Sequence, residues 1–347
     1  MPRKSQFDLV IVGGGLAGIV AALELLDHDI NIAIIDRDIE QNFGGLAKNS
    51  LGGMTLVNTP IQRLNGIHDH PETALRDWLS FAQFSDNDIW PKKWAELYVN
   101  RSVDDIYQWL KPKGIHFFPV PHWVERGDFG DGNSLPRYHI VWGTGHHLVH
   151  TLINEIKQHR NAARLSCYFG HKVESLLMEN RSVAGVQGCL EESGQEFEIH
   201  APLVLVASGG INGDINRVKQ EWDQSWGQAP QHILNGAHRF ADGTLHDAVQ
   251  NIDGNVTNLH QMWNYAAGIH HPNPRVPLEG LSLIPPKSAL WLDATGTRFG
   301  PLPLVTGFDT HMICKRIAQD PHGYSWQVMN WKIASKEIAV SGAESNT

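Results

Sequence analysis

The stretch DLVIVGGGLAG, residues 8–18, decides how the chain is expected to fold. In it a short apolar run leads into the glycine pattern Gly13-x-Gly15-x-x-Gly18. In a strand–turn–helix unit the first glycine permits a tight turn and the second lets main-chain atoms approach a pyrophosphate. The third lets the helix pack closely on the strand. The pattern alone also occurs in ordinary glycine-rich turns, so the residues around it decide its meaning.

The residues that follow complete a nucleotide-binding unit in the right order. Residues 19–26 have the pattern of a helix, and Leu16 and Ala17 stand at its N-terminus, where unpaired N–H groups and a partial positive charge favour phosphates. Residues 30–35 form a second apolar run that ends at Asp36. This acid lies 36 − 13 = 23 residues after the first glycine, where a carboxylate accepts from a ribose hydroxyl. A dinucleotide-binding βαβ unit is predicted.

Composition and charge argue against several classes of protein. The 347 residues are 41% hydrophobic and 19% charged, and this length suggests two domains. A net charge of −9 without a basic stripe argues against a nucleic-acid partner. No apolar run approaches the roughly 20 residues that span a bilayer. Three widely spaced cysteines, Cys167, Cys189 and Cys314, fit free thiols in a reducing cytoplasm better than a disulfide framework.

Tryptophan and histidine are in excess, with 12 and 20 residues. Six tryptophans fall in one region of the chain: Trp78, Trp90, Trp94, Trp109, Trp123 and Trp142. They are expected to fill a core, or else to wall an apolar pocket beside a flat cofactor. The histidine groups at 68–70 and 146–150 lack carboxylates or thiolates at ligand spacing, so no metal site is expected.

Two further glycine-rich segments lie where a long ligand needs support. Residues 43–54 read FGGLAKNSLGGM and directly follow the predicted ribose acid, which favours a loop against the cofactor over a surface loop. Residues 203–206 are wholly apolar and are therefore expected to form a buried strand. That strand ends at the turn Ala207-Ser208-Gly209-Gly210, on the sheet edge where ligands gather in open α/β folds.

Periodicity along the rest of the chain suggests how it is organised. Helical spacing over 71–84 and 92–110 predicts a mostly helical insertion at about 71–145. From 165 to 200 the apolar period becomes two, which predicts a β-meander of short strands. Proline and histidine become frequent past residue 250, which indicates a domain boundary.

One glycine turn with an acid suits either NAD or the adenosine half of FAD, whereas supports along the whole sheet edge favour FAD. With these segments in order, the chain resembles the FAD-dependent oxidoreductase family of fumarate reductase, succinate dehydrogenase flavoprotein and 3-ketosteroid dehydrogenase. Within it, the chain is most similar to ketosteroid-dehydrogenase-like FAD-binding dehydrogenases. Residues 240–244 resemble the family's Gly-Asp-Gly element, with Ala241 in place of the first glycine.

The resemblance implies FAD as the cofactor and a set of residues that bind it. These are Gly13, Gly15, Leu16, Ala17, Gly18, Asp36, Arg37, Gly44, Gly45, Leu46, Ser50, Gly52, Gly53, Val173, Ala207, Ser208, Gly209 and Asp242. It also implies an α/β fold: a Rossmann-like FAD-binding domain with a parallel sheet and β-meander over 1–250, and a partial α+β cap, or substrate domain, over 251–347. Members of the family continue well beyond Thr347, so the chain resembles a truncated product, a fragment or one piece of a split protein.

The cap carries the catalytic candidates that the resemblance implies. His271, in the motif at 269–272, sits where fumarate reductases have a His-Pro pair beside the substrate; alternatively it is a loop histidine fixed by the following proline. Phenols do the acid–base work in the ketosteroid enzymes. Tyr265 is the preferred candidate because it lies near His271 in the sequence, ahead of Tyr138 and Tyr324.

The expected function is that of an FAD-dependent dehydrogenase or reductase acting on a carbon–carbon bond next to a carbonyl, in an apolar substrate such as a steroid-like ketone. In such enzymes the flavin exchanges a hydride, while polar groups polarise the carbonyl and an acid or base handles a proton. The expected partners are a small-molecule substrate and an electron donor or acceptor. Two alternatives stay open: an FAD-binding fragment without catalysis, and an NAD-linked dehydrogenase.

Overall fold

A four-stranded parallel sheet forms the centre of the N-terminal half of the molecule. The computed structural model describes residues 6–126, 131–284, 286–300, 304 and 309–340. The strand order is β5-β2-β1-β9. These strands are β1 (Leu9–Val12), β2 (Ile32–Ile35), β5 (Leu165–Tyr168) and β9 (Leu203–Val206). Because all four run parallel, their carboxyl ends meet at one edge, as the predicted Rossmann-like α/β fold requires.

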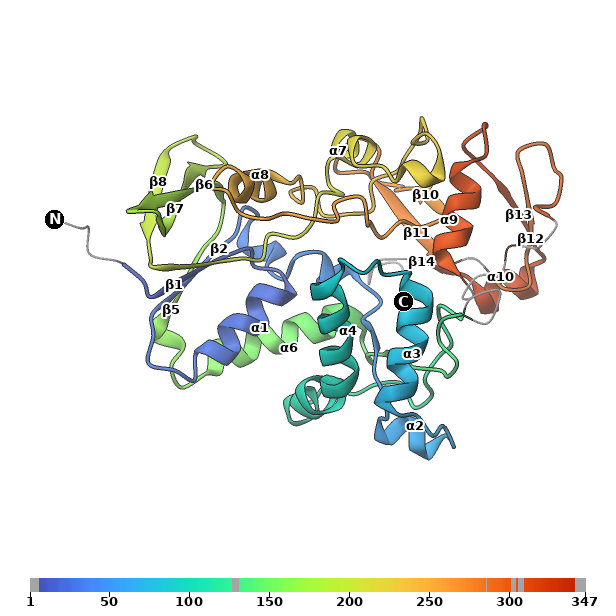
Figure 1. Cartoon of the computed structure of the whole chain (residues 1–347), viewed down its shortest axis with the longest axis horizontal. Coiled ribbons are helices and arrows are strands. Elements are labelled where there is room, and N and C mark those ends of the chain that lie inside the picture. The colour runs from blue at the N-terminus through green and yellow to red at the C-terminus, as the bar shows by residue number, and fades with distance from the viewer. Residues whose placement is uncertain (1–5, 127–130, 285, 301–303, 305–308, 341–347) are drawn as a thin grey trace.

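Helices cover one face of this sheet and the β-meander covers the other (Figure 1). Helices α1 (Leu16–Leu25) and α6 (Thr144–Gln158) pack on isoleucines of β1 and β2. The alternate side chains of the same strands pack against the meander and α8 (Thr244–Gln250). The meander consists of β6 (His171–Glu179), β7 (Ser182–Leu190) and β8 (Glu196–His200). Burial on both faces explains why β1 and β2 are almost continuously apolar.

Two strands differ from the sequence expectation. β5 is expected to open the meander, but it pairs with β2 and forms one edge of the main sheet. β9 is expected to be buried, but Leu203 is 60% and Leu205 38% exposed, whereas Val204 packs against the meander side of the sheet. The exposure arises because β9 pairs only with β1 among the described strands. An apolar sequence does not by itself distinguish a central strand from an edge strand.

A mostly helical segment lies between β2 and β5 and includes the stretch 71–145. Its helices and turns are η1 (Glu40–Asn42), η2 (Gly45–Asn49), α2 (Pro60–Leu64), α3 (Pro71–Ala82), α4 (Ile89–Arg101), η3 (Ser102–Tyr107), α5 (Gln108–Leu110), η4 (Lys111–Lys113) and η5 (Ala162–Arg164). The short strands β3 (Gly53–Thr55) and β4 (Tyr138–Ile140) pair antiparallel within it. Helix α2 begins with a capping box in which the Thr59 hydroxyl accepts from the Gln62 N–H and the Gln62 side chain accepts from the Thr59 N–H.

Several tryptophans of this insertion lie on the surface. Trp90 is 69%, Trp94 65% and Trp142 62% exposed, so for these three both expectations, a core position and a pocket wall, are wrong. Helix α4 packs inward with the face that carries Ala95 and Val99. Trp90 and Trp94 therefore remain exposed to solvent. The count of tryptophans indicates nothing about which face of a helix packs inward.

The C-terminal third forms a cap built of small antiparallel sheets and short helices. Its elements are β10 (Gly268–His270), β11 (Gly280–Ile284), β12 (Leu290–Leu292), α9 (Thr310–Ala318), β13 (Trp326–Val328), α10 (Trp331–Glu337) and β14 (Ala339–Val340). Two helices from before residue 250, α7 (Ile215–Gln220) and η6 (Gln224–Trp226), lie with them. Strands β10, β11 and β14 form one sheet, and β12 and β13 another. Val218, Trp222 and Trp226 pack against Cys314 of α9, so α7 and η6 belong with the cap although they precede residue 250.

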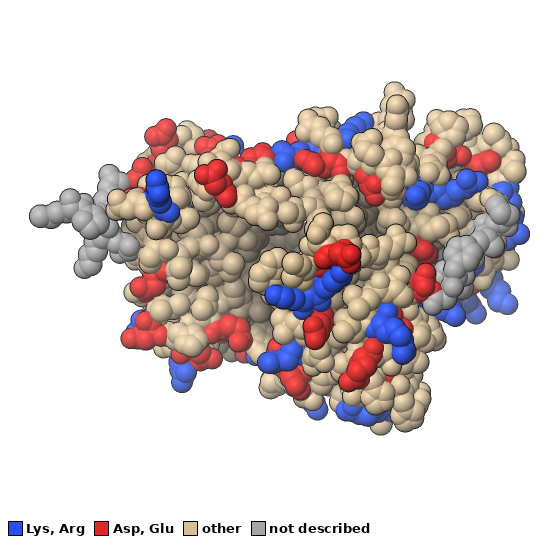
Figure 2. Space-filling view, in the orientation of Figure 1, with Lys and Arg blue, Asp and Glu red and all other residues tan. Residues whose placement is uncertain are grey.

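Charged side chains of both signs are interspersed on the face drawn in Figure 2. This agrees with a net charge of −9 that is not gathered into a stripe. Within the described residues, none of the helices combines the length and apolarity that crossing a membrane requires. The described part of the chain also contains no cluster of three or more His, Cys, Asp or Glu side chains arranged to hold a metal ion.

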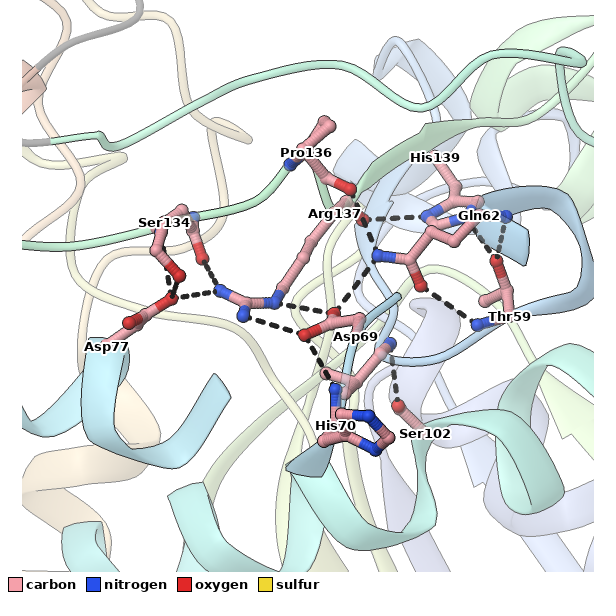
Figure 3. Close-up of polar contacts among 12 residues, drawn as sticks. Thr59, Gln62, Asp69, His70, Asp77, Ser102, Ser134, Pro136, Arg137 and His139 are labelled. Carbon is pink, nitrogen blue, oxygen red and sulfur yellow. Dashed lines mark hydrogen bonds and ion pairs between the residues drawn. The ribbon is translucent and has the colours of Figure 1, made fainter. Parts of the chain in front are cut away.

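Within the insertion, a buried ion-pair network joins helix α3 and the residues just before it to the segment that leads into strand β4 (Figure 3). Arg137 is only 1% exposed. Its Nε and Nη2 donate to the two carboxylate oxygens of Asp69, both at 2.8 Å, and its Nη1 donates to Asp77 at 2.7 Å. Two parallel hydrogen bonds between a guanidinium and a carboxylate are among the strongest in proteins. Burial by itself raises the pKa of the Asp77 carboxyl, but hydrogen bonds from Ser134 and Arg137 lower it below its ordinary value.

The same network extends to the neutral residues of α2 and β4. The Gln62 side-chain amide donates to Asp69 at 3.0 Å and to the Pro136 carbonyl at 3.0 Å. The Thr59 hydroxyl lies 2.8 Å from His139 Nε2. Every buried polar group named here therefore has a partner, which is what makes burial of charge tolerable. The result is a rigid frame that holds β4 beside β3.

We predict that Arg137→Ala lowers the free energy of unfolding by about 3–5 kcal/mol, because it leaves two carboxylates buried without their cation. Urea denaturation followed by circular dichroism measures this change. The control is Arg101→Ala, which removes the exposed ion pair with Asp105 and is expected to change stability little. Equal stability of the two variants would contradict the role given to the network.

Candidate functional site

A large cavity lies at the carboxyl edge of the parallel sheet, between the sheet and the cap. Its volume is about 1390 Å³, larger than the roughly 300–1,000 Å³ of ordinary small-ligand pockets. Figure 2 shows the surface hollowed between the two halves of the molecule. On the sheet side the cavity is lined by the turn after β1, the end of β2, residues 45–47 and the end of β9. Gly13, Gly45 and Gly209 therefore open onto one crevice.

The three glycines of the first turn have different surroundings. Gly13 has a φ of +113°, and a Cβ added to it would lie 2.3 Å from the carbonyl oxygen of Ala207. A Cβ on Gly18 would lie 2.1 Å from the carbonyl oxygen of Gly13. A Cβ on Gly15 would meet no atom within 4 Å, although Gly15 lines the cavity. Gly13 and Gly18 thus serve packing, and Gly15 leaves free the space that a phosphate needs.

The second glycine loop lies directly against this turn. The Gly44 N–H donates to the Gly14 carbonyl at 2.9 Å, and a Cβ on Gly45 would lie 3.2 Å from Gly15 Cα. Both glycines have positive φ, +115° for Gly44 and +58° for Gly45. Leu46 lines the cavity beside them, together with Leu16 and Ala17 of α1. The structure therefore brings two segments about thirty residues apart onto one wall.

Three predicted cofactor residues at the end of this loop do not line the cavity. The Ser50 hydroxyl donates to the Ala47 carbonyl at 2.8 Å and accepts from the Gly52 N–H at 3.2 Å. Gly52, with a φ of +74°, packs against the start of α6. Gly53 lies under the ring of Tyr138. In the structure these residues shape the loop, and their contact with a cofactor stays a prediction.

Asp36 stands at the end of β2 and lines the cavity; its contact with a ribose stays a prediction. Its Oδ2 accepts from the Gly14 N–H at 2.6 Å and its Oδ1 from the Asp38 N–H at 2.7 Å. Burial raises the pKa of this carboxyl above its ordinary value, against the opposing effect of the two N–H groups. Asp36 therefore also fastens the glycine turn, a role that the sequence pattern does not indicate.

Arg37 is held by acidic residues and an aromatic ring. Its Nη1 donates to Asp242 at 2.7 Å and its Nε donates to Glu191, and its guanidinium lies 4.4 Å from the centre of the Phe240 ring. Burial by itself raises the pKa of the Asp242 carboxyl, but hydrogen bonds from Thr244 and Arg37 bring it below its ordinary value. A guanidinium engaged in this way is poorly placed to receive the 2′-phosphate of NADP.

A second ion-pair group lies beside the first. Asp38 is buried, and its carboxylate lies 3.2 Å from His238 Nε2 and 3.0 Å from Arg239 Nη2. Together, the Arg37 and Asp38 groups fasten residues 238–242 across the end of β2. His238 and Phe240 both line the cavity. The sequence analysis named neither as a cofactor residue: His238 lies outside any motif, and Phe240 begins the recognised segment 240–244, in which Asp242 was the residue chosen.

Val173, one of the cofactor residues that the resemblance implies, is buried in β6 and lines the cavity, as does His171. The His171 Nδ1 lies 2.7 Å from the Phe169 carbonyl oxygen, which fixes the orientation of its ring. Ala207 and Ser208 line the cavity from the end of β9. Among the predicted cofactor residues, Gly18 and Gly44 stand behind the wall and support it.

The structure separates the catalytic candidates of the cap. Tyr265 and Tyr324 line the cavity, and so does His270, whereas His271 does not. The His271 ring Nδ1 accepts from the Asn273 main-chain N–H at 3.0 Å. The main-chain N–H of His271 donates to the Glu279 carbonyl at 2.9 Å. This is the arrangement of a histidine fixed in a turn. The chemical roles of Tyr265 and His271 stay predictions.

Tyr138 lies behind the cavity wall. Its ring packs on Gly53, and burial, with Tyr265 as an electrostatic neighbour, raises its pKa to about 12. Burial also raises the pKa of Tyr265. At neutral pH both phenols are therefore protonated, so they donate rather than accept protons in hydrogen bonds to an anion or carbonyl.

Glu125 is a further residue that the sequence analysis missed. It has a φ of +50°, and its carboxylate accepts from the N–H of Thr310 at 3.1 Å and from the Thr310 hydroxyl. Burial raises the pKa of the Glu125 carboxyl, and Thr310 opposes this effect. Thr310 begins α9, so Glu125 ties the helical insertion to the helix that carries Cys314 and Ile317 into the cavity wall.

Charge is distributed unevenly along the cavity. Among its described lining residues, the charged side chains are Asp36 and Arg37 at the end of β2, and Asp242, which Arg37 holds there. The described lining residues of the cap are apolar, aromatic or neutral polar ones, together with His270. The sheet side therefore suits a polar nucleotide, and the cap side suits an uncharged ligand.

Comparison with known proteins identifies relatives of the chain. Residues 8–346 match the family model described as FAD binding domain. A KsdD-like steroid dehydrogenase of Mycobacterium tuberculosis is 40% identical over 98% of this chain, and one of Mycolicibacterium smegmatis is 38% identical over 98%. The chain spans 62% and 64% of the lengths of these two relatives.

Two solved structures share the fold. The 3-ketosteroid-Δ4-(5α)-dehydrogenase of Rhodococcus jostii, in complex with 4-androstene-3,17-dione, has a TM-score of 0.66 at 16% identity, covering 97% of this chain and 69% of that one. The open conformation of a flavocytochrome c3 fumarate reductase also has a TM-score of 0.66, at 19% identity, covering 96% of this chain and 54% of that one.

The glycine turn yields a prediction that separates packing from ligand binding. Gly18→Ala places its methyl group against the Gly13 carbonyl and is expected to lower stability by about 1–3 kcal/mol. Gly15→Ala meets no protein atom, so the apoprotein keeps its stability while the flavin-to-protein ratio falls. Gly300→Ala, at a site with an ordinary contact of 3.9 Å, is the control. A Gly15→Ala protein that retains full flavin would contradict the phosphate position.

Asp36 yields a second prediction. Asp36→Ala removes both the ribose acceptor and the partner of the Gly14 N–H, and hydrogen bonds to a charged group contribute roughly 1.5–3 kcal/mol. We therefore expect the FAD affinity of Asp36→Ala to be about 10- to 100-fold lower than that of the native protein. The affinity of Asp36→Asn is expected to lie between those of the native protein and Asp36→Ala. Flavin fluorescence titration of the apoprotein measures it, and replacement of the exposed Asp86 by alanine is the control. Unchanged affinity in Asp36→Ala would exclude the ribose role.

Proposed function

This chain belongs to the FAD-binding-domain family and has FAD as its cofactor, and on that premise we propose that it is a dehydrogenase or reductase of an apolar ketone. The reaction is the transfer of a hydride to or from a carbon–carbon bond next to a carbonyl. The steroid dehydrogenase relatives support the assignment to the FAD-dependent oxidoreductases. The proposed substrate class rests on the lining of the cavity.

The observation that carries the proposal is the absence of charge on the cap side of the cavity. Among the described lining residues of the cap there is no Lys, Arg, Asp or Glu. A dicarboxylate such as fumarate needs cationic groups to replace its water, because an unpaired buried carboxylate is costly. A neutral, mostly apolar ketone needs only shape and a few hydrogen bonds. The cavity therefore favours the steroid-like branch of the family over the dicarboxylate branch.

Main-chain groups are proposed to hold FAD along the sheet edge. The pyrophosphate lies at Gly15 and the N–H groups that begin α1. The space there is open, since a Cβ added to Gly15 would meet no protein atom within 4 Å. The ribose lies at Asp36, and the adenine lies against Val173. The segment 238–242, fastened by Arg37 and Asp38, encloses this end. When bound, the flavin supplies the two-electron chemistry.

Tyr265 is the proposed catalytic residue of the cap. It lines the cavity, and its raised pKa keeps the phenol protonated at neutral pH, so it can donate a hydrogen bond to the substrate carbonyl and polarise it. His271 is the second candidate, one residue after the cavity-lining His270. It needs a movement of the turn at 271–273 to reach the cavity.

The proposed division of the chain is an FAD-binding domain over 1–250 and a cap, or substrate domain, over 251–347, against which α7 and η6 of the first part pack. The cap's own buried cluster of Trp291, Phe299, Leu304 and Ile313 supports it. We further propose a cytoplasmic location, supported by three cysteines without a disulfide, and a separate electron donor or acceptor. The rival functions are FAD binding without catalysis and an NAD-linked dehydrogenase.

The test is spectroscopic. The purified chain is expected to show a flavin spectrum that bleaches anaerobically on addition of a saturated 3-ketosteroid, or recovers from the reduced state with an unsaturated one. Fumarate is expected to do neither. Flavin that responds to fumarate alone would overturn the substrate class, and flavin that responds to no ketone would favour FAD binding without catalysis.

For the catalytic residue, Tyr265→Phe is expected to lower kcat by about 100-fold or more, the range for loss of one hydrogen-bond donor to a polarised carbonyl, without loss of flavin. Tyr324→Phe, at another cavity-lining tyrosine, is the matched control. Equal rates for native protein and Tyr265→Phe would remove Tyr265 from the mechanism.

A further inference from the structure

Tyr265, the proposed catalytic residue, lies in a segment that has no regular secondary structure. Residues 261–267 form neither a helix nor a strand, although Tyr265 lines the cavity. A donor that polarises a carbonyl is effective only when it is held in a fixed position. The contacts that hold this segment in place therefore matter to the proposed reaction.

Helix α9 packs directly on the segment that carries Tyr265. The Cys314 Sγ donates to the main-chain carbonyl of Asn264, the residue before Tyr265, at 3.1 Å. Burial raises the pKa of the Cys314 thiol to about 12, so the sulfur keeps the proton that it donates. Ala266, on the other side of Tyr265, packs against the apolar clusters that contain Cys314 and Ile313. A displacement of α9 would therefore displace Tyr265.

The first turn of α9 is held from outside the cap by Glu125. The Glu125 carboxylate accepts from the Thr310 N–H at 3.1 Å and from the Thr310 hydroxyl. The N–H of this first helical residue has no acceptor within the helix, and a carboxylate is favourable near a helix N-terminus. The Asp309 side chain accepts from the Met312 N–H at 2.7 Å. One N–H group of this turn is thus satisfied within the cap and another by the insertion.

Glu125 is itself part of a rigid structure. Its φ of +50° is uncommon for a residue with a side chain. Its main-chain carbonyl accepts from the Asn133 N–H at 2.7 Å, and a Cβ on Gly132 would lie 2.4 Å from the same carbonyl oxygen. The Asn133 side chain in turn accepts from Arg137 at 2.9 Å. Glu125 is therefore joined to the buried network of Figure 3.

The Glu125 carboxylate also influences the phenol of Tyr265 electrostatically. Burial raises the pKa of Tyr265, against the opposing effect of a hydrogen bond with Trp263. Cys314 and Glu125 are electrostatic neighbours that raise it further. Such an effect weakens with distance, so it agrees with a carboxylate close to the phenol. Glu125 is not among the described lining residues of the cavity, so any effect on a ligand passes through the residues in front of it.

We propose that Glu125 is a positioning residue, which holds the Tyr265 phenol in place through Thr310, α9 and Cys314. The inference rests on the proposed function, because it assigns a support to the catalytic residue of that reaction. The path begins in the helical insertion and ends in the cap. The competing explanation is that the contact between Glu125 and Thr310 only adds stability to the cap.

The first measurement needs no substrate. The FAD-loaded chain is labelled with 3-fluorotyrosine, and its six tyrosines are observed by fluorine NMR, with the Tyr265 resonance assigned by its absence in Tyr265→Phe. We expect Glu125→Ala to shift or broaden this resonance, and Glu125→Gln, which keeps one acceptor oxygen, to change it less. Thr310→Val removes only the hydroxyl bond and is expected to act in the same direction, so it replaces Glu125→Ala if that variant does not fold.

Glu337→Ala is the matched control. The Glu337 carboxylate accepts from the N–H of Ser288 at 3.0 Å and from its hydroxyl at 2.9 Å, the same pair of bonds in a part of the cap outside α9. It is expected to leave the Tyr265 resonance unchanged. A Tyr265 resonance that is unaffected by Glu125→Ala, or affected equally by Glu337→Ala, would overturn the inference.

The second measurement is kinetic. With a 3-ketosteroid that the native protein converts, Glu125→Ala is expected to lower kcat by about ten- to 100-fold, the range for misplacement of a catalytic group, with little change in KM. In the Tyr265→Phe background it is expected to lower kcat no further, because the group that it positions is already absent. An equal loss in both backgrounds would contradict the path through Tyr265. If the native chain converts no ketone, the proposed function fails, and the NMR measurement still decides whether Glu125 positions Tyr265.

Discussion

The close approach of two main-chain segments at the edge of the parallel sheet is the constraint on which the site depends. Gly13 and Ala207 end β1 and β9, and a Cβ on Gly13 would lie 2.3 Å from the Ala207 carbonyl oxygen. Gly18 lets α1 sit equally close to the same turn. Because side chains are excluded from this junction, Gly13, Gly15 and Gly209 contribute only main-chain atoms to the crevice. The cofactor wall thus consists of backbone whose position the sheet itself fixes.

Local sequence predicted this part of the molecule well because its requirements are local. A tight turn, a close helix and an acid at the end of β2 follow from residue types at fixed spacing, and the structure places Gly15, Asp36 and Val173 on one cavity. Contacts between distant segments were not predictable in the same way. The exposure of β9 depends on which strands lie beside it, and the exposure of Trp90 depends on which face of α4 packs inward.

Charged residues illustrate the same limit. Arg137 is fixed by Asp69 and Asp77, which lie 68 and 60 positions away in the sequence. None of the three belongs to a spacing pattern, and an Arg or Asp in isolation predicts a surface position. Only the assembled fold shows that they neutralise one another. Arg37 is similar, because its partners Glu191 and Asp242 come from the meander and from the turn before α8.

The arrangement of charge within the cavity explains how one fold separates cofactor binding from substrate choice. Asp36, Arg37 and Asp242 gather at the end of β2, where polar ribose and phosphate groups gain most from fixed dipoles and charges. The described lining of the cap offers aromatic and aliphatic side chains with a few neutral donors such as Tyr265. A ligand on that side is selected by how much apolar surface it removes from water and by whether its oxygens meet hydrogen-bond donors. On the proposed function, substitutions in the cap lining are those expected to alter substrate preference, and substitutions at the sheet edge are those expected to alter cofactor affinity.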